Sequence, residues 1–103
     1  MIIPAERPTS VGEMLVEEFL DPMEITQGKL ADAMGVGRKT VNELCVGKRS
    51  VTAETAFLLS KVLGTSPEFW LNLQRLNDLW EAKHSAKLNL KLEKATSLVA
   101  EIA

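Results

Sequence analysis

Residues 27–44 read QGKLADAMGVGRKTVNEL, and this stretch predicts two short helices that are joined by a tight turn. Ala31 is small where a second helix must cross closely, and Gly35 can adopt the left-handed conformation that a turn requires. Such a hairpin presents its second helix outward, where it can enter the major groove of DNA. The apolar positions expected to lock its two helices at a steep angle are Leu30, Met34, Val36, Val41 and Leu44.

Helix signals flank this hairpin on both sides, and strand signals are almost absent. Ser10 and Glu13 form the pattern of a capping box, which opens a helix that should run to about Leu20. Asp21 should end that helix, because the residue before a proline avoids helical geometry. Further helices are expected over residues 27–34, 38–46, 53–63 and 67–83, with N-caps and C-terminal glycines at Thr26, Thr52, Ser66, Gly35, Gly47 and Gly64. The sequence therefore predicts an all-α fold, with five helices in one compact domain over residues 1–84.

Residues 85–103 fit two patterns. Leu88, Leu90 and Leu92 alternate with polar residues, as in a half-buried strand, whereas the wider spacing of apolar residues fits one side of a helix. We favour a helix because Ala, Leu, Lys and Glu predominate. An isolated helix of this size is marginal, so the C-terminal extension should pack on its own domain or on a second copy of the chain. The residues expected at a dimer interface are Leu88, Leu92, Val99 and Ile102.

Charge is unevenly distributed along the chain. The formal net charge of −2 argues against a nucleic-acid partner. Residues 1–26 carry six acids and one base, however, whereas residues 27–49 carry five bases and two acids. This segregation places positive potential on the predicted hairpin, which is the kind of surface that a phosphate backbone attracts.

No catalytic residue, cofactor or metal ion is expected. Cys45 and His84 are the single cysteine and the single histidine, and neither has neighbours in sequence that would complete a metal site or activate a nucleophile. Cys45 is expected to be a small buried hydrophobe. The chain has no long apolar run and its start lacks the pattern of a secretory signal, so we expect a cytoplasmic protein without membrane contact.

The hairpin resembles the helix-turn-helix of the phage-repressor (Cro-type) family, from its opening at residues 26–27 to the loop at residues 47–49. This resemblance implies that the second helix reads DNA bases, with Thr40 at a phosphate or a thymine methyl group. Arginine and lysine suit guanine, asparagine suits adenine, and glutamate can accept only from a donor such as the cytosine amino group. The side chains that it places toward base edges are Arg38, Lys39, Asn42 and Glu43.

The same resemblance implies three phosphate contacts. Gln27 would bond a phosphate at the start of the first motif helix, and Lys48 and Arg49 would hold others in the loop that follows the second. The sequence departs from the family pattern at two positions. Gly37 stands where a serine or threonine usually caps the second helix, and Glu43 introduces a negative charge that would repel phosphates or narrow the sequence preference.

A later segment resembles a signature of HigA-type antitoxins, also known as virulence-associated protein I. It comprises residues 63–74, LGTSPEFWLNLQ, followed by residues 78–80, DLW, and residues 11–15 fit the same pattern. The resemblance covers about residues 9–83 and implies a homodimer that binds an inverted-repeat operator in its own promoter. It also implies a partner, a HigB-type toxin that cleaves mRNA. The aromatic and leucine positions of this segment are expected to be mostly buried, namely Phe69, Trp70, Leu73, Leu76 and Trp80.

Two other kinds of protein fit the same sequence. One is a stand-alone transcriptional regulator of the same fold that has no toxin partner. The other is a protein-interaction module that has lost DNA binding, which the net negative charge and the acid at position 43 would favour. An enzyme is the least expected class, because no carboxylate pair, catalytic triad, phosphate-binding loop or zinc motif is present in the sequence.

Overall fold

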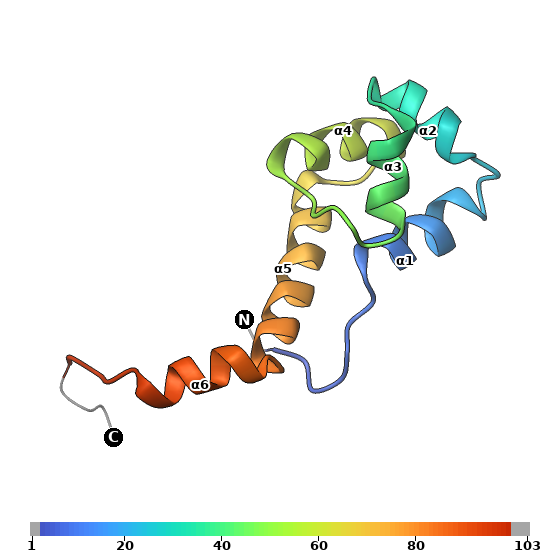
Figure 1. The fold of residues 1–103 in the computed structure, drawn as a ribbon. Coiled ribbons are helices and arrows are strands. Elements are labelled where there is room, and N and C mark those ends of the chain that lie inside the picture. Colours follow the sequence, from blue (N-terminus) through green and yellow to red (C-terminus); the bar gives the residue numbers. More distant parts are fainter. Residues whose placement is uncertain (1–2, 100–103) are drawn as a thin grey trace.

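A computed structural model describes residues 3–99, and over this range every regular element is a helix (Figure 1). The predicted all-α class, with a helix-turn-helix domain and an additional C-terminal helix, is confirmed. The elements in chain order are α1 (Val11–Leu15), η1 (Val16–Leu20), α2 (Gln27–Met34), α3 (Arg38–Cys45), α4 (Ala53–Leu63), α5 (Pro67–Lys83) and α6 (Ala86–Lys94).

Capping residues fix the helix starts where the sequence places them. The Ser10 hydroxyl accepts a hydrogen bond from the Glu13 amide at 3.1 Å, and the Glu13 carboxylate accepts one from the Ser10 amide at 3.0 Å. These bonds hold the pKa of the Glu13 carboxyl below its ordinary value. The hydroxyl groups at the starts of α2, α4 and α5 cap in the same way, and they belong to Thr26, Thr52 and Ser66.

The first helix ends differently from the prediction. It widens into the π-helical turn η1, in which the Asp21 amide donates to the Val16 carbonyl at 2.9 Å. Asp21 therefore keeps helical angles, φ −65° and ψ −52°, and the expectation that it leaves the helical region is wrong. The hydrogen bonds of the wider turn outweigh the preference of a residue before proline. The chain reverses only at Glu24, which has φ +54°, and the Ile25 amide then bonds to the Leu20 carbonyl.

The core lies among α1, η1, α2, α3 and α4, and α5 closes it with a single tryptophan. Trp70 is fully buried, and its indole nitrogen donates to the Thr65 hydroxyl at 2.6 Å. No polar or charged residue is buried within the described range. The buried apolar residues are Val11, Leu15, Leu20, Leu30, Ala31, Met34, Val41, Leu44, Val51, Ala56, Leu59, Leu63 and Trp70.

A close backbone contact fixes α1 against α3. Gly12 is buried, and a Cβ atom at this position would overlap the carbonyl oxygen of Cys45. It would also lie 2.8 Å from the Cys45 carbonyl carbon and 3.0 Å from the Leu44 carbonyl oxygen. Because backbone atoms cannot move aside as a side chain can, glycine is required here, and the first helix sets the position of the end of α3.

Figure 1 shows that α5 runs away from the body of the domain, with the N-terminal segment approaching its far end. The long axis of the molecule is 53 Å and the two others are 23 Å. The Asn77 amide donates to the Thr9 carbonyl at 2.9 Å, and the Trp80 indole donates to the Ala5 carbonyl at 3.5 Å. Trp80 also stacks on the His84 ring at a centroid distance of 4.2 Å.

This course of α5 overturns one expectation. Of the five positions predicted to be mostly buried, only Trp70 is buried in the single chain. Phe69 is 37% exposed, and the other three are half-buried, namely Leu73, Leu76 and Trp80. A helix of 17 residues reaches beyond a domain of this size, so at Leu76 and Trp80 the N-terminal segment gives only a partial cover.

The C-terminal extension also differs from the prediction. A helix forms, but it ends at Lys94, and α6 buries none of its residues: Leu88 is half-buried and Leu92 is 59% exposed. Val99 is therefore not on a helix, and it is 75% exposed, while Ile102 lies outside the described residues. The Ser97 hydroxyl bonds to the backbone of Val99, which competes with helix formation.

Candidate nucleic-acid interface

The predicted hairpin is formed by α2 and α3. Gly35 ends α2 with φ +73°, and the Val36 amide bonds back to the Ala31 carbonyl at 3.0 Å. Ala31, Val41 and Leu44 are at most 1% exposed where the two helices meet, so this contact is fully packed. The opposite side of α3 is polar and turned outward. Its exposed or half-buried residues are Arg38, Lys39, Thr40, Asn42 and Glu43.

A hydrogen bond joins the polar residues of the two helices. The Asn42 amide nitrogen on α3 donates to the Gln27 side-chain oxygen on α2 at 3.2 Å. Fifteen positions separate these residues, and sequence reasoning listed both without pairing them. The bond leaves the Asn42 oxygen, one Asn42 amide hydrogen and the Gln27 amide free. Asparagine needs the first two of these to pair with adenine, so the contact orients Asn42 without using up its recognition groups.

A shallow hollow of about 360 Å³ opens between the starts of α2 and α3. Gly37 occupies the N-cap position of α3 and makes no side-chain cap, as the sequence indicated. The Thr26 hydroxyl at the other wall is engaged in capping, since it accepts from the Lys29 amide at 3.1 Å. The hollow is positive and polar, and its walls are formed by Thr26, Gln27, Gly28, Arg38, Lys39 and Asn42.

The loop after α3 contains a contact that the sequence did not suggest. The Arg49 guanidinium donates twice to one Glu43 carboxylate oxygen, from Nη2 at 2.8 Å and from Nε at 3.2 Å. The Arg49 hydrogen bond holds the pKa of Glu43 below its ordinary value. These two residues, expected to contact DNA separately, are thus paired with each other. Lys48 is exposed beside them.

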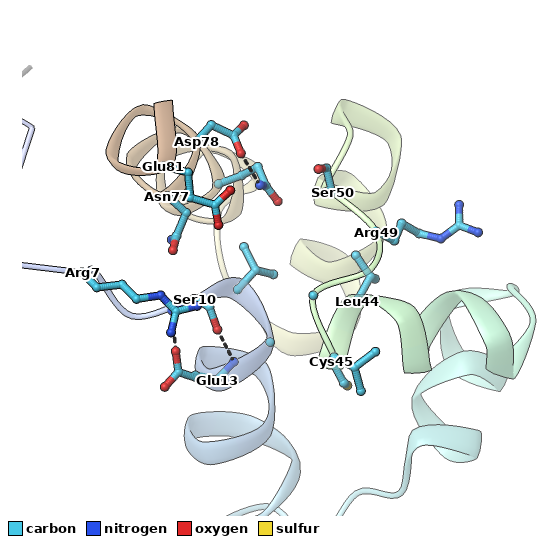
Figure 2. A pocket seen from close by; sticks show the side chains of 15 residues that line it. Arg7, Ser10, Glu13, Leu44, Cys45, Arg49, Ser50, Asn77, Asp78 and Glu81 are labelled. Atoms are coloured by element: carbon cyan, nitrogen blue, oxygen red, sulfur yellow. Dashed lines mark hydrogen bonds between the residues drawn. The ribbon is translucent and has the colours of Figure 1, made fainter. Parts of the chain in front are cut away.

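A second hollow of about 450 Å³ lies between α1, the loop after α3, and α5. Figure 2 shows Arg7, Ser10 and Glu13 on one side of it and Asp78 and Glu81 on the other, with the guanidinium of Arg49 directed away. Asp78 accepts from the Gln74 amide at 2.9 Å. Carboxylates outnumber guanidinium groups around this hollow, so it offers no positive surface to a phosphate.

Cys45 and possible metal ligands are the remaining candidate groups. Cys45 is half-buried, and burial raises the pKa of its thiol, so the thiolate form is disfavoured. Between residues 3 and 99 no three His, Cys, Asp or Glu side chains lie close enough together to hold a metal ion. In the same range no helix combines the length and the apolar character needed to cross a membrane.

Known proteins are similar to this chain in sequence and in fold. The helix-turn-helix family matches residues 16–70. Antitoxin HigA-1 of Vibrio cholerae is 50% identical over 88 residues, which cover 85% of this chain and 83% of that protein. The structure of antitoxin GraA in complex with its operator is 38% identical with a TM-score of 0.83, covering 97% of this chain and all of that one.

A further solved structure is Pseudomonas aeruginosa antitoxin HigA with the higBA promoter. It is 33% identical with a TM-score of 0.78, and the match covers 91% of this chain and 100% of that one. These relatives match the chain over most of their own length. The chain belongs to the HigA family of helix-turn-helix antitoxins.

Proposed function

We propose that this protein is the antitoxin of a HigBA-type pair, which neutralises an mRNA-cleaving toxin and represses its own operon by binding operator DNA. The observation that carries the DNA half is the outward face of α3, where Asn42 is bonded to Gln27 on α2 beside two exposed cations. The similar structures solved with an operator or a promoter support the same role. The toxin half rests on the likeness to Antitoxin HigA-1 of Vibrio cholerae.

Four residues of the α3 face have a proposed contact. Arg38 and Lys39 would bond guanine, Asn42 would pair with adenine, and Thr40 would reach a phosphate or a thymine methyl group. The backbone contacts would come from Gln27 and from Lys48, which is exposed in the loop after α3, whereas the Glu43 carboxylate would hold Arg49 away from a phosphate. Phosphate contacts would fix the orientation of the protein on the duplex, and α3 would supply the sequence preference.

We also propose that the protein binds as a homodimer through the second half of α5 and the extension of residues 85–103. The half-buried Leu76 and Trp80 are followed by α6, where Leu92 is 59% exposed and lies one helical turn from the half-buried Leu88. A second copy would cover this apolar surface, and Leu88 and Val99 would lie within the same contact. A two-fold dimer can place two α3 helices in successive major grooves, roughly 34 Å apart.

The mode of action would be binding and not catalysis, and its place would be the cytoplasm, where operator and toxin are both present. The titration that tests the DNA half uses the purified full chain and a fluorescent duplex covering the promoter of its gene, with a scrambled duplex as control. We expect the promoter to bind at least about 10³-fold more tightly. A footprint should show two protected half-sites. Equal binding of both duplexes by folded protein would contradict the DNA half.

Co-expression with the neighbouring reading frame tests the toxin half. The toxin should copurify with the antitoxin, and growth arrest caused by the toxin alone should be relieved. Specific DNA binding without a toxin would identify a stand-alone regulator. A toxin complex without DNA binding would identify an interaction module. Failure of both measurements would overturn the proposal.

Neutralising Glu43 is expected to strengthen DNA binding. Glu43→Gln removes the carboxylate that holds Arg49 at 2.8 Å, and the freed guanidinium can then reach a phosphate. One additional phosphate contact steepens the dependence of log affinity on log salt concentration by about 0.9. Titrations at several salt concentrations measure this slope. The matched control is Glu18→Gln on η1, which makes the same charge change at an exposed residue outside α3 and outside the proposed dimer contact. Equal slopes for the two variants would contradict a specific role of the Glu43–Arg49 pair.

A further inference from the structure

Gly28 is a buried residue in the first turn of α2, and the side chain of Arg38 lies across it. A Cβ atom at position 28 would stand 2.5 Å from Nη2 of Arg38, 2.6 Å from Nε and 2.9 Å from Cζ. These distances are far shorter than van der Waals contact. The Arg38 guanidinium therefore occupies the space that a side chain at position 28 would fill.

No hydrogen bond or ion pair in the described structure fixes this guanidinium. Within residues 3–99 the ion pair that forms is between Arg49 and Glu43, and no hydrogen bond or salt bridge from Arg38 to another side chain is present. All five N–H donors of Arg38 thus stay available to a ligand, while contact with the backbone of α2 limits where the group can lie. The guanidinium forms a wall of the same hollow as Asn42 and Lys39.

We propose that Gly28 is a positioning residue for operator recognition. By lacking a side chain it lets the Arg38 guanidinium lie against α2, and so it fixes the direction in which Arg38 presents its donors beside Asn42. The proposal rests on the proposed DNA-binding function. It adds a residue that contacts no base itself and acts through Arg38, because a guanidinium held in one place loses less conformational freedom when it binds.

Gly28→Ala tests this directly. The atoms in the way belong to the end of a flexible, exposed side chain, so Arg38 can swing out and the fold should persist. Alanine also favours a helix more than glycine does, so the melting temperature should stay the same or rise. Affinity for the promoter duplex should fall by about 5- to 100-fold, the range for losing one specific side-chain contact to a base. Lower affinity with undiminished stability is a result that a merely structural glycine would not give.

A double-mutant cycle identifies the partner. If Gly28 acts through Arg38, Gly28→Ala should have no further effect on affinity in an Arg38→Ala protein. It should keep its full effect in a Lys39→Ala protein, which lacks another side chain of the same hollow and serves as the matched control. An equal loss in both backgrounds would overturn the proposal.

A measurement without DNA separates this inference from the proposed function. The ¹⁵N relaxation of the Arg38 Nε–H group should report restricted motion in the original protein and fast reorientation in Gly28→Ala. Restricted motion of Arg38 in a protein that binds no promoter would show that Gly28 positions Arg38, but not for operator recognition. The proposal as stated would then fail together with the DNA-binding function. Fast reorientation in both proteins would overturn the positioning role even if the promoter is bound.

Discussion

Replacing Arg38 and Lys39 together by alanine is expected to weaken binding to the promoter duplex by about 30- to 25,000-fold. Both side chains are exposed at the start of α3 and border the hollow in front of Gln27 and Asn42. Each good contact of this kind discriminates by about 1–3 kcal/mol, and the product of two gives the stated range. Neither residue belongs to the buried core, so the circular dichroism spectrum and the melting temperature should change little.

A second variant separates recognition from net charge. Lys61→Ala combined with Arg75→Ala removes one lysine and one arginine that are exposed on α4 and α5. Binding of the promoter should fall far less than with the α3 variant, and the preference over a scrambled duplex should persist. If the two double variants lose affinity equally, α3 does not read the operator. The same anisotropy titration, performed at one salt concentration, measures both.

Trp70→Ala is expected to lower the free energy of unfolding by about 3–5 kcal/mol. Trp70 is fully buried. The centroid of its ring lies 5.4 Å from the ring centroid of Phe19 and 5.0 Å from that of Phe69. Truncation leaves a cavity where α5 meets the rest of the core, and it leaves the Thr65 hydroxyl without its donor at 2.6 Å. Domains of this size have a total stability of about 5–15 kcal/mol, so a large part would be lost.

Urea unfolding followed by circular dichroism gives this value. The matched control is Phe69→Ala, which removes the neighbouring ring from a position that is 37% exposed. Its cost should be clearly smaller, because less apolar surface leaves contact with protein. A similar loss for both variants would contradict the view that Trp70 alone closes the core. Unchanged slopes of free energy against urea concentration would show that both variants unfold in the same two-state manner.

The parts of the fold that could be predicted depend on residues close in sequence. The cap at Thr26 needs only the Lys29 amide three positions later, and the turn at Gly35 needs only its own φ of +73°. For the same reason the start of α5 at Ser66 and its end at Lys83 follow the prediction. Helix caps and turns of this kind depend on residues a few positions apart, so the sequence alone is enough to predict them.

The parts that could not be predicted depend on distances across the fold. Sequence reasoning named Gln27, Asn42, Glu43 and Arg49, but it could not tell that they form two pairs, because each pair joins different elements. Gly28 was missed entirely. Its only signal in the sequence was a glycine inside a helical pattern, which gives no hint of the side chain lying over it.

The length of the C-terminal extension and its exposure could not be predicted from the periodicity of its apolar residues. The spacing of the apolar residues predicted a helix as far as Ile102. In the structure α6 ends at Lys94, because over the described residues no surface of the domain packs against further helical turns and stabilises them. The apolar side chains in the second half of α5, Leu76 and Trp80, are likewise only half-buried in the single chain. Patterns of apolar residues indicate that a surface will be covered, but they do not say whether the cover comes from the same molecule.

The projecting α6 has a consequence for how long the protein survives in a cell. A nine-residue helix with no fully buried residue is expected to be only marginally stable, and an unfolded segment is what a protease cleaves. If a second copy covers α6, as proposed, pairing withdraws this segment from attack. Scarce molecules, which are mostly single, would then be degraded faster than abundant ones, and the lifetime of the antitoxin would increase with its own concentration.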